Sequence, residues 1–549
     1  MNYQNDLTNK KSDLPTMVLH WGMVIALLVS VSTGWRIVSM TDTGNWMRWV
    51  DFFVLQGNVE HWHFVSASLL TGLVIAYLGF LVTQGLGGRL SFRGSSLRSP
   101  DRHARWTAIN KLIYWGALAL LALAAITGTL LYFFPGALPT EALVVVHKLV
   151  SWAFVFYIVL HVVAQLLMGG LRQLLKIVSP RMAYGMGAVT ALTLGLAGTA
   201  LAYLADRSAQ DTLSVVRTEA APVLDGNGEE KAWADAPEAI VHTSRGFNLA
   251  NDSGEVAVHV KAVRDDNRAY FLFRWQDATR SQKHIPLQKT AEGWKLMHSQ
   301  YFINDENDYY EDKFAVMLAP SPIAGGNTMN IGPKPFKDKP GPGNGLGLHA
   351  TTDGSLADVW HWKSVRSGTL NQFDDNYFGA PMEPKPSGRY TAGYTQDPKT
   401  AGGFESLFEK IPDSDYVKLK ALPNDINLVL ERMGSFDPNP DVSDMGELYA
   451  IPKGELVPYT EELDANIPVG TVIPSVVSDK PFEGDRGDVQ AHAQWKDGWW
   501  TIEASRALDT GSQYDQAIAS DVFMWVAVFD HNQVRHTRHV HPLRLAVAP

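Results

Sequence analysis

Five long apolar runs within the first 205 residues constrain the fold more than any other feature of this 549-residue sequence. They cover approximately residues 17–39, 62–84, 108–133, 142–169 and 183–205. A helix needs about 20 apolar residues to cross the hydrocarbon core of a bilayer, so each run is long enough to span a membrane. From residue 206 onward the sequence is polar and rich in Gly, Pro, Asp and Asn. The sequence therefore predicts a bundle of five transmembrane helices followed by a water-soluble domain.

Basic residues in the short loops predict the direction of these helices. The loop after the second run carries five arginines between residues 89 and 105, and the loop after the fourth carries Arg172, Lys176 and Arg181. Because Lys and Arg accumulate in cytoplasmic loops, we expect a cytoplasmic N-terminus. An odd number of crossings then puts the C-terminal domain outside. In a Gram-negative bacterium this corresponds to a multi-pass inner-membrane protein with a periplasmic domain.

Composition excludes several classes of partner and cofactor. The formal net charge of -10 argues against a nucleic-acid partner. The sequence has no cysteine, which excludes disulfides, iron–sulfur clusters, thiolate zinc sites and covalently attached c-type haem. Any redox cofactor must therefore be held by His, Met, Lys or carboxylate side chains.

Histidines within the predicted helices indicate where such a cofactor binds. His20 lies near the inner end of the first helix, His61 and His63 at the outer end of the second, and His147 and His161 in the fourth. A single histidine at such a place is often interfacial, but polar side chains at membrane depth are costly unless they have partners. Fourteen residues advance a helix by about 21 Å and nearly four turns. His147 and His161 therefore share one face at two depths and can each ligate a haem, His147 with His63 or His61, and His161 with His20.

These residues resemble the di-haem cytochrome b subunits of respiratory formate dehydrogenases and nickel–iron hydrogenases. The resemblance covers about residues 15–175 and rests on His20-Trp21, the segment at 63–67 and the fourteen-residue interval. It implies a four-helix di-haem core at 1–182, with b-type haem iron bound by His20, His63, His147 and His161. It also implies electron exchange with quinone or quinol. The fifth helix, 183–205, is expected to be an addition that exports the C-terminal domain.

The segment 206–549 is predicted to be an all-β sandwich. Apolar and polar residues alternate at 256–263 and 269–275, with a turn at 265–267 between them, which is typical of a β-hairpin. Further strands are expected at 313–318, 499–504 and 522–529.

Short motifs in this segment resemble the haem-binding domain of the gamma subunits of ethylbenzene dehydrogenase and related molybdenum enzymes. That domain is similar to family 9 carbohydrate-binding modules. The matching stretches are 222–226 with Trp233, 270–277, 311–315, 357–363, and 498–503 with Arg506. In those subunits a Met and a Lys hold one b haem.

This sequence departs from the gamma subunits at both ligand positions. It offers His349 near the first, and His531, His536, His539 and His541 near the second. We therefore expect a third haem, bound by His349 and His536, with His539 as the alternative ligand in the tail. In the alternative interpretation, the tail histidines lie at the solvated end of a strand and bind no haem.

Together these features predict a membrane b-type cytochrome with two membrane haems and one outer-domain haem. It would transfer electrons between the quinone pool and a periplasmic redox protein or enzyme subunit. Two alternatives remain: a membrane oxidoreductase acting directly on a small oxidant or metal, and a cytochrome anchor that carries a haemless ligand-binding sandwich. Haem content separates the first prediction from the last, with three haems per chain against two.

Overall fold

The computed structural model divides into two compact units, residues 1–209 and 210–549, and each is described by itself. The structure describes residues 14–41, 54–55, 59–175, 177–178, 186–209, 211–246, 248–249, 254–297, 309–322, 330–331, 348–349, 351, 354–380, 394–412, 414–433, 450–533 and 536–549.

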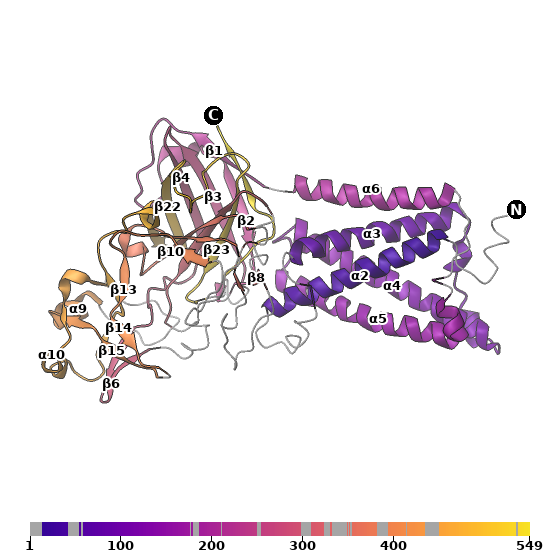
Figure 1. Ribbon diagram of the computed structural model, residues 1–549, viewed down its shortest axis with the longest axis horizontal. Coiled ribbons are helices and arrows are strands. Elements are labelled where there is room, and N and C mark those ends of the chain that lie inside the picture. Colours follow the sequence, from indigo (N-terminus) through magenta and orange to yellow (C-terminus); the bar gives the residue numbers. More distant parts are fainter. Residues whose placement is uncertain are drawn as a thin grey trace. The chain divides into compact units, whose positions relative to one another are not determined.

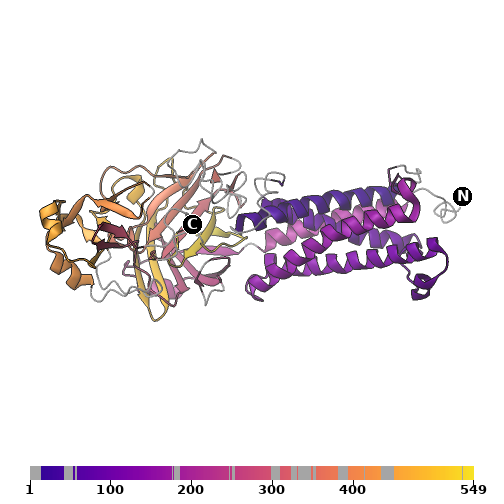
Figure 2. The ribbon, with the colours of Figure 1, turned by 90° about the horizontal axis from the view of Figure 1, so that it is seen from below.

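The first unit contains five long helices that run side by side (Figure 1, Figure 2). They are α2 (Leu14–Thr41), α3 (Val59–Thr83), α4 (Arg102–Phe133), α5 (Thr140–Leu175) and α6 (Met186–Ser208). All five are long and apolar enough to cross a membrane, which confirms the predicted bundle. Helix α4 begins at Arg102, earlier than its apolar run, because the Asp101 carboxylate accepts hydrogen bonds from the backbone N–H groups of His103 (3.0 Å) and Ala104 (3.1 Å).

Helix α3 packs against both α2 and α6, while α4 packs against α5. The contact between α3 and α6 is made by small residues. A Cβ atom on Gly72 would lie 3.1 Å from the carbonyl oxygen of Gly195, and one on Gly198 would lie 3.3 Å from the Cα of Gly72. Close backbone approach of this kind is how helices associate in lipid, where burial of apolar surface gives little drive. The fifth helix is therefore packed directly against a helix of the predicted four-helix core.

The second unit is built on one sheet of twelve strands. Across the sheet the order is β12 (Tyr394–Gln396), β11 (Asp374–Phe378), β10 (Ala357–Lys363), β7 (Lys313–Ala319), β23 (Phe523–Phe529), β24 (Leu543–Val547), β1 (Thr212–Arg217), β3 (Val256–Arg264), β4 (Arg268–Gln276), β22 (Trp499–Ala507) and β21 (Gln490–Lys496), with β2 (Glu238–Thr243) also paired to β3. The five strands predicted from the alternating pattern are all present, as β3, β4, β7, β22 and β23.

The sheet curls so that strands from its two halves face each other across one aromatic core. Trp275 of β4 stacks on Phe314 of β7 with ring centres 4.9 Å apart, and Phe271 meets Trp360 of β10 edge-on at 5.6 Å. All four side chains have 0% exposure. Burial of such large rings supplies much of the drive for folding. The predicted sandwich is therefore one curled sheet.

The β3–β4 hairpin forms because its turn supplies its own hydrogen bonds. The two strands pair antiparallel from Val258–Trp275 to Arg264–Ala269. Asp265 Oδ1 accepts from the backbone N–H groups of Asn267 and Arg268, both at 2.8 Å. A side chain that satisfies the turn's backbone donors fixes the register of both strands.

A smaller set of strands and helices has a second core that sequence patterns did not predict (Figure 1). Its sheet has the order β14 (Phe408–Lys410), β15 (Tyr416–Leu419), β6 (Gly293–Leu296), β5 (Leu287–Thr290) and β19 (Val472–Ile473). The remaining short elements are α7 (Lys231–Asp235), β8 (Asn330–Ile331), β9 (Leu348–His349), β13 (Phe404–Ser406), β16 (Ala421–Pro423), α9 (Ile426–Met433), β17 (Ile451–Pro452), β18 (Leu456–Pro458), α10 (Glu461–Ala465), β20 (Val476–Ser478) and five 3-10 turns, η2 (Gly87–Arg89), η3 (Gly94–Arg98), η6 (Gly368–Leu370), η7 (Lys453–Glu455) and η8 (Asp485–Gly487).

Candidate haem sites

The structure brings together His63 of α3 and His147 of α5. Their ring centres are 6.1 Å apart and the rings are inclined by 77°. His63 Nδ1 lies 3.0 Å from the carbonyl oxygen of Ser30 and 3.0 Å from Thr33 Oγ1. A carbonyl can only accept, so Nδ1 carries the proton and Nε2 carries the lone pair that a metal needs.

His147 is held by a hydrogen bond to α4. Its Nδ1 lies 2.8 Å from Thr127 Oγ1 on α4, and that hydroxyl is itself 2.8 Å from the carbonyl oxygen of Leu123. Because the hydroxyl donates its proton to the helix backbone, its oxygen accepts from Nδ1 of His147. His147 therefore has the same tautomer as His63, with Nε2 available to a metal.

The second pair, His20 of α2 and His161 of α5, has ring centres 6.3 Å apart. Two tyrosine rings flank His161, Tyr114 at 5.4 Å and Tyr157 at 5.6 Å. His161 Nδ1 is buried without a hydrogen-bond partner among the described residues. The non-helical backbone of α5 lies beyond this histidine, at Gly169 and Gly170.

The two pairs fit haem iron held between two imidazoles. A metal–imidazole bond is about 2.0 Å long, so two rings that share one metal have centres about 6 Å apart. Glycines adjoin both rings of the pair formed by His63 and His147: a Cβ on Gly34 would come within 3.2 Å of the His63 ring, and one on Gly128 within 3.4 Å of the His147 ring. These positions leave room beside the imidazoles that a larger side chain would fill.

A polar group that the sequence analysis did not identify lies near the pair formed by His20 and His161. Gln165 Nε2 donates to Asn110 Oδ1 at 2.7 Å and to the Tyr114 hydroxyl at 3.3 Å. Gln165 follows His161 by four residues on α5, and Tyr114 follows Asn110 by four on α4, so each pair shares a helix face. The available signal was this spacing of polar residues within two apolar helices.

In the β unit, the backbone of His349 forms part of β9, and its side chain lies outside the described residues. The His536 ring is 4.9 Å from the ring of Phe529, and its Nδ1 donates to the carbonyl oxygen of Thr537 at 2.7 Å. A histidine whose Nδ1 donates to a backbone carbonyl is oriented as metal-binding histidines commonly are.

His539 is not available as a ligand, so the alternative assignment in the tail fails. Its Nε2 accepts from the backbone N–H of Val526 at 2.9 Å, and its Nδ1 donates to the carbonyl oxygen of His541 at 2.7 Å. Burial lowers the pKa of His539 to about 4, which keeps the ring neutral. Nε2 thus attaches the tail to β23, and Nδ1 bonds within the tail, so both ring nitrogens are engaged.

His361 of β10 is a second candidate, which the sequence analysis did not select. Its ring stacks on Phe529 at 5.3 Å, and its Nε2 is buried without a hydrogen-bond partner among the described residues. The pKa of His361 lies well below its usual value. Loss of hydration is the main cause, and the positive charge of Lys363 is the next. His361 and His536 therefore both contact the ring of Phe529, whereas Trp360 and Trp362 on either side of His361 belong to the core.

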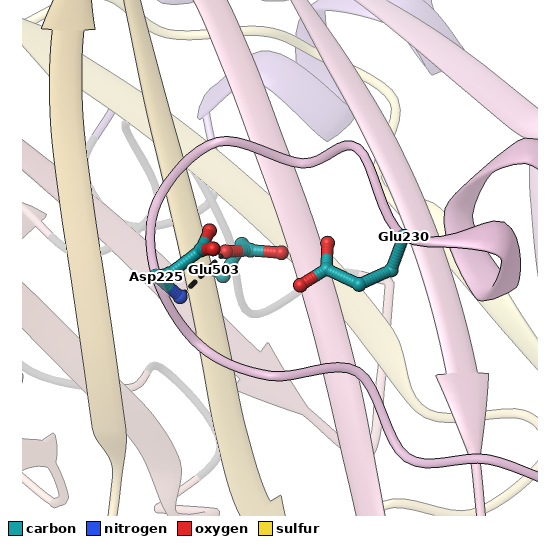
Figure 3. A group of neighbouring side chains, drawn as sticks. All are labelled: Asp225, Glu230 and Glu503. Atoms are coloured by element: carbon teal, nitrogen blue, oxygen red, sulfur yellow. Dashed lines mark hydrogen bonds between the residues drawn. The ribbon is translucent and has the colours of Figure 1, made fainter.

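Three carboxylates from the motif stretches have a structural role. Glu503, Asp225 and Glu230 lie together (Figure 3). The fully buried Glu503 carboxylate accepts from the backbone N–H groups of Asp225 (3.0 Å) and Gly226 (2.6 Å) and from Trp233 Nε1 (2.6 Å). Burial raises its pKa to about 7. Glu503 therefore ties the 222–226 loop and Trp233 to β22, which explains why these stretches occur together.

Comparisons with known proteins gave matches to two families. Residues 11–180 match the family model of prokaryotic cytochrome b561, and residues 230–541, more than half of the chain, match that of ethylbenzene dehydrogenase. No curated protein matches the chain.

Two solved structures of a family 9 carbohydrate-binding module from Caldicellulosiruptor kristjanssonii also align. The complex with glucose is 10% identical, covers 62% of this chain and 97% of the module, and has a TM-score of 0.23. The complex with cellotriose is 9% identical, covers 62% and 95%, and has a TM-score of 0.21. Similarity at this level carries no argument about this chain.

The cytochrome b561 match agrees with the five apolar helices and implies b-type haem and electron transfer in a multi-pass membrane protein. The chain therefore belongs to the ethylbenzene dehydrogenase family, and it joins that domain to an N-terminal prokaryotic cytochrome b561 domain.

Proposed function

We propose that this chain passes electrons between the quinone pool and a redox partner on the outer side of a bacterial cytoplasmic membrane. The observation that carries the proposal is that one helix, α5, presents two histidines at different depths, each about 6 Å from a histidine of another helix. When bound, haem supplies an iron that takes up and releases one electron.

In this proposal the histidines determine the kind of reaction. Two imidazoles on one iron leave no open coordination position, which favours electron transfer over binding of a substrate at the metal. Thr33, Ser30 and Thr127 orient the outer pair through Nδ1. The apolar helices around them restrict access of water. His536, with His349 or His361, would hold the third haem in the outer domain.

The direction of the chain follows from its basic residues. Arg89 and Lys111 lie at the end of the bundle where α3 ends and α4 begins, and Lys111 Nζ donates to the carbonyl oxygens of Gly88 and Ser91, both at 2.8 Å. By the excess of basic residues in cytoplasmic loops this end faces the cytoplasm. The pair of His20 and His161 is then the inner one, and the β unit is periplasmic.

Quinone would bind near the inner pair. Asn110, Tyr114 and Gln165 supply amide and phenol groups there, which can hydrogen-bond a quinone carbonyl oxygen or a quinol hydroxyl. Gln165→Leu and Asn110→Leu should slow haem reduction by a quinol analogue while leaving reduction by dithionite unchanged.

Haem content of the purified full-length chain tests the proposal. Pyridine haemochrome should give three haems per chain, one fewer in His147→Ala, one fewer in His161→Ala and one in the double variant. His103→Ala is the matched control, because His103 is an exposed residue at the start of α4. Retention of both membrane haems by the double variant would refute the ligand assignment. A content of two haems in the unmodified chain would remove the outer-domain haem from the proposal.

A further inference from the structure

The β unit contains an acidic group that has no part in haem binding. Asp375, Asp397 and Asp515 each have a carboxylate oxygen within 4.8 Å of the others. Asp358 and Asp488 act electrostatically on the same carboxylates. We refer to these five residues as the aspartate group.

Strand register places three of its members on one face of the sheet. Asp375 of β11 pairs with Trp360 of β10, two residues from Asp358 on the same face. Asp397 directly follows β12, and its N–H donates to the carbonyl oxygen of Asp375 at 3.2 Å. Asp488 follows the turn η8, and Asp515 lies in the segment between β22 and β23. The aspartate group thus joins three neighbouring strands to two loops.

Three members of the group are buried, and many of its carboxylate oxygens lack donors. Exposure is 0% for Asp358 and Asp375 and 2% for Asp397, whereas Asp488 and Asp515 are half-buried. In the part of the chain that the structure describes, seven buried oxygens have no hydrogen-bond partner: Asp358 Oδ1, Asp375 Oδ2, both oxygens of Asp397, both of Asp488, and Asp515 Oδ1. A buried carboxylate without donors or a counter-ion is strongly unfavourable.

Asp358 is only partly satisfied. Its Oδ2 accepts from Arg506 and from the backbone N–H of Gln516 (3.0 Å), while Oδ1, in a side chain with 0% exposure, has no donor among the described residues. Arg506 offsets one of five potential negative charges. Burial and neighbouring carboxylates raise the pKa of Asp397 to about 9 and that of Asp488 to about 8, so either protons or a bound cation must neutralise the remainder.

The donor set selects the type of cation. Every member offers carboxylate oxygen, the ligand that Ca²⁺ takes in sets of six to eight, and three of the carboxylates lie close enough to share one ion. Zinc and copper favour nitrogen and sulfur ligands, and Mg²⁺ usually retains several waters. We propose that the aspartate group binds a calcium ion, which fastens the edge of the sheet formed by β10, β11 and β12 to the two loops.

The two other acidic groups of the described residues differ in degree. In each of them one buried oxygen, Asp277 Oδ2 or Glu230 Oε2, lacks a donor, while the carboxylates of Asp312 and Glu503 receive their donors from the chain. Asp312 accepts from the backbone N–H groups of Ser281 (2.6 Å) and His531 (3.1 Å) and from Trp500 Nε1 (3.1 Å). Glu503 accepts from three donors as described above. Neither carboxylate needs a cation.

Calcium binding by the full-length, detergent-solubilised chain tests the proposal. After an EGTA wash, addition of calcium chloride should raise the melting temperature of the β unit, since a ligand that binds only the folded state stabilises it. Terbium chloride should give luminescence sensitised by Tyr377, which stacks on Tyr514 beside the group at 5.2 Å. Excess calcium should displace terbium.

Variants locate the ion. Asp397→Asn and Asp515→Asn should each weaken calcium binding about tenfold or more, whereas Glu230→Gln, in the group of Figure 3, should leave it unchanged. If Asp397→Asn does not fold, Asp488→Asn replaces it. The proposal fails if calcium changes neither melting temperature nor luminescence in the unmodified chain, or if Glu230→Gln abolishes the response.

Discussion

Replacing Thr127 by Val should raise the midpoint potential of the haem that we propose is bound by His63 and His147. The change keeps the shape of the side chain and removes the oxygen that lies 2.8 Å from His147 Nδ1. A hydrogen bond at Nδ1 makes the imidazole a stronger donor to iron and so favours the oxidised state. Loss of this bond leaves a buried N–H unsatisfied, at a cost of about 1–3 kcal/mol.

The size of the shift follows from how much of that energy depends on oxidation state. If about 1 kcal/mol does, the potential rises by about 40 mV for a one-electron couple. Thr33→Val should give a smaller shift, because His63 Nδ1 keeps the carbonyl oxygen of Ser30 at 3.0 Å. Redox titration of the full-length chain, followed at the haem absorption bands, measures both.

Two further variants serve as controls for this prediction. Thr127→Ser retains the hydroxyl and should restore the original potential. Thr71→Val removes a hydroxyl of α3 that donates to the carbonyl oxygen of Ala67 at 2.9 Å, and it should have no effect. The reasoning is refuted if Thr127→Val leaves the potential unchanged, or if Thr33→Val shifts it as far.

Two other predictions concern packing and pH. Gly34→Leu should expel the outer haem, because a Cβ there already lies 3.2 Å from the His63 ring; Gly116→Leu, where a Cβ meets nothing within 4 Å, should keep full haem content by pyridine haemochrome. The buried, neutral His539 has a pKa of about 4, below the usual value of 6.5, so its contribution to stability is complete above pH 6.5 and falls by about 1.4 kcal/mol per unit as the pH drops toward 4. His539→Gln should flatten the pH dependence of the melting temperature over this range. The variant should also be less stable at pH 7, because it loses the bond to the N–H of Val526. An unchanged slope would contradict the assignment of His539 as a buried, neutral acceptor.

Much of the membrane unit could be predicted from sequence, because its features depend on the length of apolar runs and on the spacing of residues along single helices. Apolar length alone identifies the five helices. The interval between His147 and His161 predicts a shared face, and depth predicts which helix meets each histidine. The ends of the helices were harder to predict, since the start of α4 depends on a cap at Asp101.

The outer domain was less accessible to sequence reasoning, because its sites combine residues far apart in the chain. The aspartate group draws one carboxylate from each of five segments between residues 358 and 515, with no recurring spacing to reveal it. The tail histidines looked equivalent as a cluster. Only strand pairing reveals that the N–H of Val526 takes a nitrogen of His539 as its acceptor. Alternation predicted the long strands but not the short ones of the smaller core, which have too few residues for a pattern.

If α5 carries a ligand for each of the two proposed membrane haems, the number of residues between His147 and His161 cannot change freely. One residue inserted between His147 and His161 would rotate the second imidazole by about 100° and turn it from its partner. Seven residues would restore its direction to within about 20° while moving the two levels about 10.5 Å further apart. Insertions within this segment should therefore be tolerated, if at all, in steps of about seven residues, and each step would slow transfer between the centres by lengthening the gap.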